Sequence, residues 1–192
     1  MKNCSRWLGW IALVAVLASP VAVVYAQTAQ AKPASADRVM AKFAAAHWIA
    51  EGSGKRILYV FVDPNCPYCR NLFDALQPEI KPRDLQVRFI VVGYLTSTSQ
   101  GKAGAILAAK DPLAALRYNE RNFGRTAPGG GIDETLPSDK TIAALDKNYR
   151  LLMSTGSSGV PAMVVLDRRQ GPRLVEGAPD AKDLRKILDD LR

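Results

Sequence analysis

Apolar residues along the chain form four short runs that predict β-strands. Residues 56–62 (RILYVFV), 85–95 (LQVRFIVVGYL) and 160–167 (VPAMVVLD) are rich in β-branched and aromatic residues and are bounded by turn-forming residues. Runs of this length and composition are typical of buried strands. The shorter run at residues 172–178 (PRLVEGA) predicts a fourth strand.

A helical spacing of apolar residues precedes the first of these strands. Residues 38–52 (RVMAKFAAAHWIAEG) show this spacing, and we expect a helix there that Asp37 caps and that ends at Gly52. Its apolar positions are Met40, Phe43, Ala44 and Trp48. The Ala-, Gln- and Ser-rich stretch before it predicts a linker.

Further helical patterns follow the first strand and cover residues 69–80, 97–154 and 180–192. We expect Pro78 to interrupt the first of them, because proline removes a helical hydrogen bond. Asp111 and Pro112 mark a break in the second, and residues 124–139, which contain three consecutive glycines, predict a loop.

The order of these elements predicts an α/β fold. A strand–helix–strand unit comes first, then a long helical insertion, then two strands and a helix. We divide the chain into a signal peptide (1–26), a linker with an N-terminal helix (27–54) and a main domain (55–192) that carries the helical insertion at about 97–154.

The first 26 residues are typical of an export signal. Lys2 and Arg6 precede an apolar run over residues 7–25, and a small residue stands at Ala26. This arrangement predicts cleavage after Ala26 and a periplasmic location for the mature protein. The alternative is an uncleaved membrane anchor, which Pro20 within the apolar run disfavours.

Composition and charge narrow the class of protein. Of the 192 residues, 48% are hydrophobic and 23% are charged, as in folded soluble proteins. The net charge of +8, which falls to +6 without Lys2 and Arg6, is spread along the chain instead of concentrated in one stretch. A dispersed basic surface and export both argue against a nucleic-acid partner.

Cysteine carries the main chemical signal. Cys4 precedes the apolar run and is expected to leave with the signal, so the mature chain keeps only Cys66 and Cys69. A structural zinc site needs four Cys or His ligands, and His47 is the one histidine. We therefore expect no metal site and interpret His47 as an ordinary surface or packing residue.

Redox chemistry fits the position of the pair. Cys66 stands where a strand ends and a helix begins, so its sulfur would meet unpaired backbone N–H groups that favour the thiolate. Pro67 suits the first helical position. Cys69, one turn further, would lie behind Cys66 and could resolve a mixed disulfide with a client.

Four segments follow one another along the chain as DPNCPYC, GAILAAKDPLAAL, GVPAMVVLD and EGAPDAKDLRKIL. In this order they resemble the thioredoxin superfamily, and within it the catalytic domain of the periplasmic disulfide isomerases DsbC and DsbG. The segment DPNCPYC is most similar to DsbG. The resemblance covers residue 56 to the end of the chain. It implies a thioredoxin fold with a helical insertion, preceded by a linker helix.

The resemblance also implies roles for individual residues. Cys66 matches the nucleophile, Cys69 matches the resolving cysteine, and Pro161 matches a cis-proline whose loop, with Val160, binds client backbone. Between the cysteines, Pro67 and Tyr68 would tune the thiolate and the face offered to clients. No cofactor is implied beyond the Cys66–Cys69 disulfide. The implied partners are client proteins with cysteines and a membrane or periplasmic redox partner.

Three features depart from the family pattern. Fewer than thirty residues lie between Ala26 and Arg56, which leaves no room for the isomerases' dimerisation domain, so we expect a monomer. Val160 stands where those isomerases have threonine, and a valine at this position is more like the oxidase DsbA. Val60 stands where thioredoxin has a buried acid, so proton transfer at Cys69 would need water or another group.

The leading hypothesis is therefore an exported thiol–disulfide oxidoreductase, DsbG/DsbC-like as a reductase or isomerase. One alternative is a DsbA-like oxidase, because the sequence does not fix the direction of exchange. A second is a binding module of a secretion or conjugation assembly in which the cysteines are incidental. A third is a copper(I) metallochaperone, for which the chain offers few ligands.

Overall fold

The computed structural model describes residues 33–125 and 128–192. The expected signal peptide, residues 1–26, and residues 27–32 of the expected linker lie outside the described residues. Within the described residues, none of the helices has the length and apolar character required to cross a membrane.

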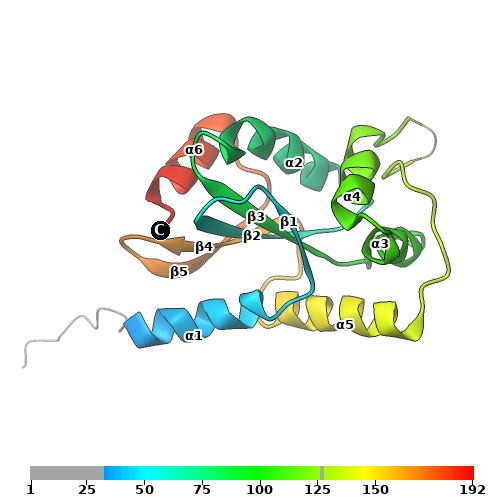
Figure 1. Ribbon diagram of the computed structural model, residues 1–192, viewed down its shortest axis with the longest axis horizontal. Coiled ribbons are helices and arrows are strands. Elements are labelled where there is room, and N and C mark those ends of the chain that lie inside the picture. Colours follow the sequence, from blue (N-terminus) through cyan, green and yellow to red (C-terminus); the bar gives the residue numbers. More distant parts are fainter. Residues whose placement is uncertain (1–32, 126–127) are drawn as a thin grey trace, which may run out of the picture. The chain divides into compact units, whose positions relative to one another are not determined.

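A five-stranded sheet forms the centre of the domain, with strand order β1-β3-β2-β4-β5 (Figure 1). The strands are β1 (Trp48–Glu51), β2 (Arg56–Val62), β3 (Leu85–Val91), β4 (Ala162–Asp167) and β5 (Gly171–Glu176). β2 and β3 run parallel, and the other neighbours are antiparallel. The predicted α/β class is confirmed, and the central strand β2 points its C-terminal end toward the cysteines.

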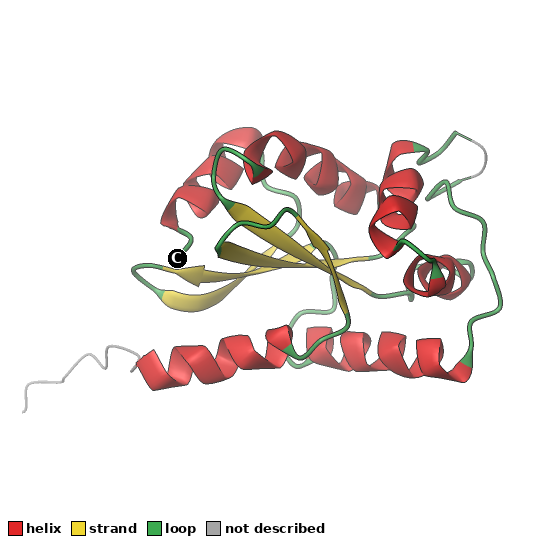
Figure 2. Cartoon of the chain, in the orientation of Figure 1, coloured by secondary structure: helices red, strands yellow, loops and turns green. Residues whose placement is uncertain are grey.

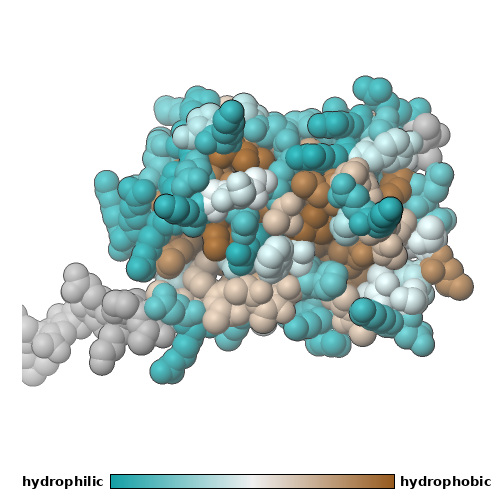
Figure 3. Space-filling model, in the orientation of Figure 1, coloured by the Kyte–Doolittle hydropathy of each residue, from teal (hydrophilic) through white to brown (hydrophobic). Residues whose placement is uncertain are grey.

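Helices cover both faces of this sheet (Figures 1 and 2). α2 (Pro67–Ile80) and α6 (Ala181–Asp190) pack on one face, and α1 (Pro33–Ala44) and α5 (Asp139–Met153) pack on the other. Alternate residues of β2 therefore enter different cores: Leu58 and Val60 lie under α2, while Phe61 contacts Phe43 of α1. Hydrophilic side chains cover most of the surface visible in Figure 3.

The N-terminal helix differs from its prediction at both ends. It begins at Pro33 instead of at Asp37, and it ends at Ala44. Trp48–Glu51, predicted as its last turn, is instead β1, which pairs with the outer edge of β3. Pairing with β3 satisfies the backbone of this edge and buries Ile49 and Glu51, which outweighs local helix propensity. The sheet thus starts at Trp48, ahead of residue 55, where the sequence analysis begins the domain.

Two smaller predictions were also wrong. α2 is not interrupted at Pro78, because this proline lies on the exposed side of the last turn, where the carbonyl that loses its partner can reach water. β3 ends at Val91 instead of at residue 95. The chain turns there because the N–H groups of Tyr94 and Leu95 donate to the Asp63 carboxylate.

The predicted helical insertion is confirmed between β3 and β4. It consists of α3 (Ser99–Ala108), α4 (Pro112–Arg121) and α5. Asn148 of α5 attaches it to the sheet: its amide nitrogen donates to the carbonyls of His47 (2.8 Å) and Val91 (2.9 Å), and its oxygen accepts from the N–H of His47 (3.1 Å). All of these bonds lie at the start of β1 and the end of β3.

Replacing Asn148 by alanine should lower the free energy of unfolding by about 2 kcal/mol, because it leaves buried backbone groups without partners. Urea denaturation followed by circular dichroism measures this. Asn148→Asp keeps the shape but cannot donate to the two carbonyls, so we expect a similar loss. An unchanged midpoint for both variants would show that the insertion is held by apolar packing alone.

Candidate active site

Cys66 occupies the N-cap of α2, four residues after the end of β2 at Val62. Its backbone is extended (φ −91°, ψ 112°), and its sulfur accepts a hydrogen bond from the backbone N–H of Cys69 at 3.1 Å. Pro67 takes the first helical position, where its missing N–H leaves no bond unmade. The predicted strand–cysteine–helix junction is therefore present, and the Cys66 sulfur faces the positive end of the helix.

The side chains of the Cys66–Cys69 segment differ in their exposure to solvent. Cys66 is 2% exposed and Cys69 is 0% exposed, and both are free thiols. Tyr68 is 64% exposed and stands out beside them. Tyr68 is therefore the side chain of the motif that a client can reach most easily, while both cysteines lie below the surface.

The two thiols differ in acidity. A hydrogen bond from the Cys69 thiol is the main cause that lowers the pKa of Cys66, and backbone N–H groups of Cys69 and Tyr68 add to it. Burial is the main cause that raises the pKa of Cys69 far above the usual value, and the hydrogen bond to Cys66 adds to it. Cys66 is thus the more acidic thiol of the pair, and Cys69 holds its proton more tightly.

The loop before β4 completes this side of the site. The peptide bond between Val160 and Pro161 is cis, as predicted. The carbonyl oxygen of Val160 lies 3.5 Å from the sulfur of Cys66 and accepts a hydrogen bond from its thiol. The loop and the cysteine, far apart in sequence, therefore meet at one point.

Asp63, the residue directly after β2, organises the loop that carries Cys66. One carboxylate oxygen accepts from the N–H of Asn65 (2.9 Å) and the hydroxyl of Ser99 (2.7 Å). The other accepts from the N–H groups of Tyr94 (2.8 Å) and Leu95 (3.1 Å). The signal available in the sequence was an acid directly after the apolar run at residues 57–62.

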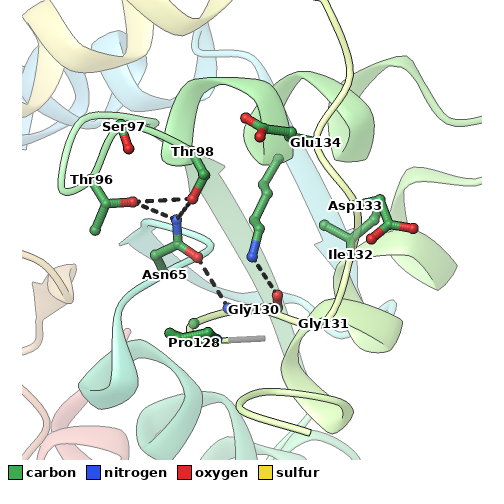
Figure 4. Close-up of a pocket in the computed structure, with 12 residues that line it drawn as sticks. Asn65, Thr96, Ser97, Thr98, Pro128, Gly130, Gly131, Ile132, Asp133 and Glu134 are labelled. Carbon is green, nitrogen blue, oxygen red and sulfur yellow. Dashed lines mark hydrogen bonds between the residues drawn. The ribbon is translucent and has the colours of Figure 1, made fainter. Parts of the chain in front are cut away.

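Asn65 joins the cysteine loop to the insertion across a cavity of about 650 Å³ (Figure 4). Its amide nitrogen donates to the hydroxyls of Thr96 (2.7 Å) and Thr98 (2.9 Å) on one side. On the other side its oxygen accepts from the N–H of Gly130 at 3.1 Å. A Cβ on Gly129 would lie 2.1 Å from this oxygen, so the close approach of the loop requires glycine.

Helix α4 of the insertion brings two further residues that the sequence analysis missed. Asn119 donates to the carbonyl of Pro64 at 3.0 Å and accepts from the N–H of Ile132 at 3.3 Å. The adjacent Glu120 is 2% exposed, and burial is the main cause that raises its pKa to about 8. An asparagine and a glutamate on a polar helix gave no local signal of burial.

The described residues offer little for a metal. Across 33–125 and 128–192, no three His, Cys, Asp or Glu side chains gather in a way that could hold an ion. The polar groups near Cys66 instead hold backbone, and the sulfur atoms are the reactive groups that this arrangement presents.

Comparison with protein families matches residues 43–192 to the thioredoxin-like domain. The chain belongs to the thioredoxin-like family. The match begins at Phe43, so it includes β1 as well as the insertion. The fold expected from the resemblance is thereby confirmed, and the elements around Cys66 are those of a thioredoxin-like domain.

Curated relatives of this thioredoxin-like chain include two proteins named thiol:disulfide interchange protein DsbG. The protein from Pseudomonas aeruginosa is 34% identical over 147 residues, which are 73% of this chain and 55% of that protein. The protein from Escherichia coli (strain K12) is 31% identical over 147 residues, 74% of this chain and 57% of that protein. The chain thus spans little more than half the length of these relatives.

Solved structures agree on the fold. A periplasmic thioredoxin-like protein from Salmonella enterica serovar Typhimurium superposes with a TM-score of 0.66 at 20% identity, over 80% of this chain and 95% of that chain. ScsC of Proteus mirabilis in a transitional conformation gives a TM-score of 0.65 at 24% identity, over 83% and 79%.

Proposed function

We propose that this protein is a thiol–disulfide oxidoreductase in which Cys66 exchanges disulfides with client proteins and Cys69 resolves the intermediate. The observation that carries the proposal is the opposite perturbation of the two thiols: the pKa of Cys66 is lowered and that of Cys69 is raised. The DsbG relatives, named for thiol:disulfide interchange, support the same chemistry.

Reduction of a client proceeds in two exchanges. The Cys66 thiolate attacks one sulfur of a client disulfide, so a Cys66–client bond forms, the client S–S bond breaks and one client thiolate leaves. Cys69 then attacks the sulfur of Cys66, which forms the Cys66–Cys69 disulfide and releases the second client thiolate. The client gains two electrons and the cysteine pair loses them. Oxidation of a client is the same path in reverse.

The Val160 carbonyl is placed to align the first exchange. It lies 3.5 Å from the Cys66 sulfur, and Val160 itself is half-buried. Val160 offers no side-chain hydroxyl to the sulfur, so backbone atoms provide the polar contact there. Tyr68, largely exposed beside the sulfur, presents apolar area to a client chain.

Within this function we propose a DsbG/DsbC-like reductase or isomerase, with a DsbA-like oxidase as the alternative. The DsbG relatives favour the first. Export to the periplasm and dependence on a separate redox partner belong to the same proposal. The N-terminal pattern of residues 1–26 supports the first, and the four segments that resemble DsbC and DsbG support the second.

The purified chain should form a Cys66–Cys69 disulfide in glutathione buffers and reduce insulin disulfides faster than dithiothreitol alone. Thiol trapping with a mass-tagged alkylating agent measures the first, and insulin turbidity measures the second. Acid-quenched trapping in cells then sets the direction: a reduced pair indicates a reductase or isomerase, and an oxidised pair an oxidase. A pair that does not form a disulfide, with no insulin reduction, would contradict the proposed function.

A further inference from the structure

Glu120 is a buried carboxyl with an unused oxygen. One of its oxygens accepts from the Asn119 side chain at 3.2 Å, and the other, Oε2, has no hydrogen-bond partner among the described residues. A buried carboxylate without partners is costly, so a group in this position readily takes up a proton. A buried polar atom without a hydrogen-bond partner calls for an explanation, and a catalytic role is one of the recognised explanations.

Four charged or titratable groups face Glu120 from helix α2 and its N-cap. Arg70 favours the ionised carboxylate. Its Nε lies 3.6 Å from Asp74, too far for a hydrogen bond, and this atom is buried without a partner among the described residues, although both side chains are about half exposed to solvent. Burial is the largest cause that favours the protonated form of Glu120, and the charges of the Cys66 thiolate and of Asp74 add to it. The fourth group is Cys69, whose pKa is raised in part by the charge of Glu120.

Geometry places Glu120 against the loop that carries the cysteines: the adjacent Asn119 donates to the Pro64 carbonyl at 3.0 Å, and the side chains of Glu120 and Cys69 are both buried. The other acid near the sulfurs is Asp63, and each of its oxygens already accepts two hydrogen bonds, so it has no free position for a proton. On β2, the buried Val60 supplies no acid. Glu120 is therefore the nearby carboxyl that has a free position for the proton of Cys69.

We propose that the Glu120 carboxyl exchanges the proton of Cys69, an inference that rests on the proposed function. When Cys69 attacks the mixed disulfide, its S–H proton passes to the Glu120 carboxylate, the Cys69–Cys66 bond forms and the Cys66–client bond breaks, and the client leaves as thiolate. When a thiolate opens the Cys66–Cys69 disulfide, Cys69 leaves and takes the proton back from Glu120.

This role links the titration of Glu120 to the redox state. The Cys66 thiolate raises the pKa of Glu120 in the dithiol form. That charge vanishes in the disulfide and in the mixed disulfide, so the pKa of Glu120 should be lower in both. The Cys69 step should therefore accelerate with rising pH and level off at or somewhat below pH 8.

The test separates the two exchanges with Ellman's reagent, added in deficit to the reduced protein. The first release of thionitrobenzoate reports the attack by Cys66, and the second reports the attack by Cys69. In Glu120→Gln the first phase should stay within about twofold, and the second should slow by about 100-fold at pH 7 and lose its inflection. Glu120→Asp, which keeps a carboxyl, should restore part of the second phase and its inflection.

Glu51→Gln is the matched control. Glu51 is also a buried carboxylate, but it is held by Arg117 at 2.8 Å and by Gln77 at 3.0 Å. Its loss should leave both phases and the inflection unchanged. A second phase in Glu120→Gln that keeps the wild-type rate and pH profile would overturn the inference and leave the function intact. Absence of the first phase in the wild type would overturn the function itself.

A measurement on the wild type alone guards against a variant that fails to fold. Carbon-13 NMR of labelled glutamate should show one buried carboxyl that titrates at lower pH in the disulfide form than in the dithiol form. A Glu120 signal that stays ionised in both forms across the pH range would identify a permanent ion pair with Arg70, and it would overturn the inference.

Discussion

Replacing Cys66 by serine is expected to reduce disulfide exchange to the uncatalysed background, a loss of about 100-fold or more. The hydroxyl cannot form the mixed disulfide, and Cys69 cannot replace Cys66, because it is fully buried and its pKa is raised far above the usual value. Insulin reduction and the first thionitrobenzoate release both measure the loss.

Cys69→Ser is the matched control for this prediction. It keeps the thiolate of Cys66 but removes the residue that resolves the intermediate, so a client mixed disulfide should accumulate and survive on a non-reducing gel. Activity retained in Cys66→Ser would remove the proposed function and favour the binding module, in which the cysteines are incidental.

The sequence predicted the centre of the site because its signals are local. A β-branched run, a turn and Pro67 in sequence place Cys66 at a strand–helix junction, and the structure confirms this arrangement. The cis peptide before Pro161 was predicted from the resemblance instead. Their roles in exchange remain predictions.

The surroundings of the site could not be predicted, because they depend on contacts between distant segments. Nothing near Glu120 in the sequence indicates that the last turn of α4 is buried against the loop that carries Cys66. The helix predicted over residues 38–52 shows the same limit: whether Trp48–Glu51 is helix or strand depends on the free edge of β3, which lies about forty residues away in the sequence.

Asp63 depends both on a local sequence signal and on contacts between distant segments. Its position directly after β2 can be read from the local sequence. Three of its hydrogen-bond donors, however, come from the turn after β3 and from the start of α3. Since the N–H of Asn65 donates to this carboxylate and Cys66 is the next residue, Asp63 sets the path of the chain into the N-cap of α2. Stability and the geometry of the site therefore depend on one side chain.

Replacing Asp63 by alanine should lower the free energy of unfolding by about 4 kcal/mol, because four donors lose their acceptor and most of this region is closed to water. Asp111→Ala is the matched control: this exposed N-cap of α4 accepts one bond from Ala114 at 3.0 Å, and its loss should cost about 1 kcal/mol. Urea denaturation measures both.

The same variant tests whether Asp63 positions Cys66. In Asp63→Ala, at a urea concentration where the protein is still folded, the first thionitrobenzoate release should slow, because the loop that presents Cys66 is no longer fixed to the turn at Tyr94 and Leu95. Asp111→Ala should keep the wild-type rate. A folded Asp63→Ala with an unchanged first phase would show that the helix N-terminus and the Val160 loop are sufficient to hold the sulfur in place.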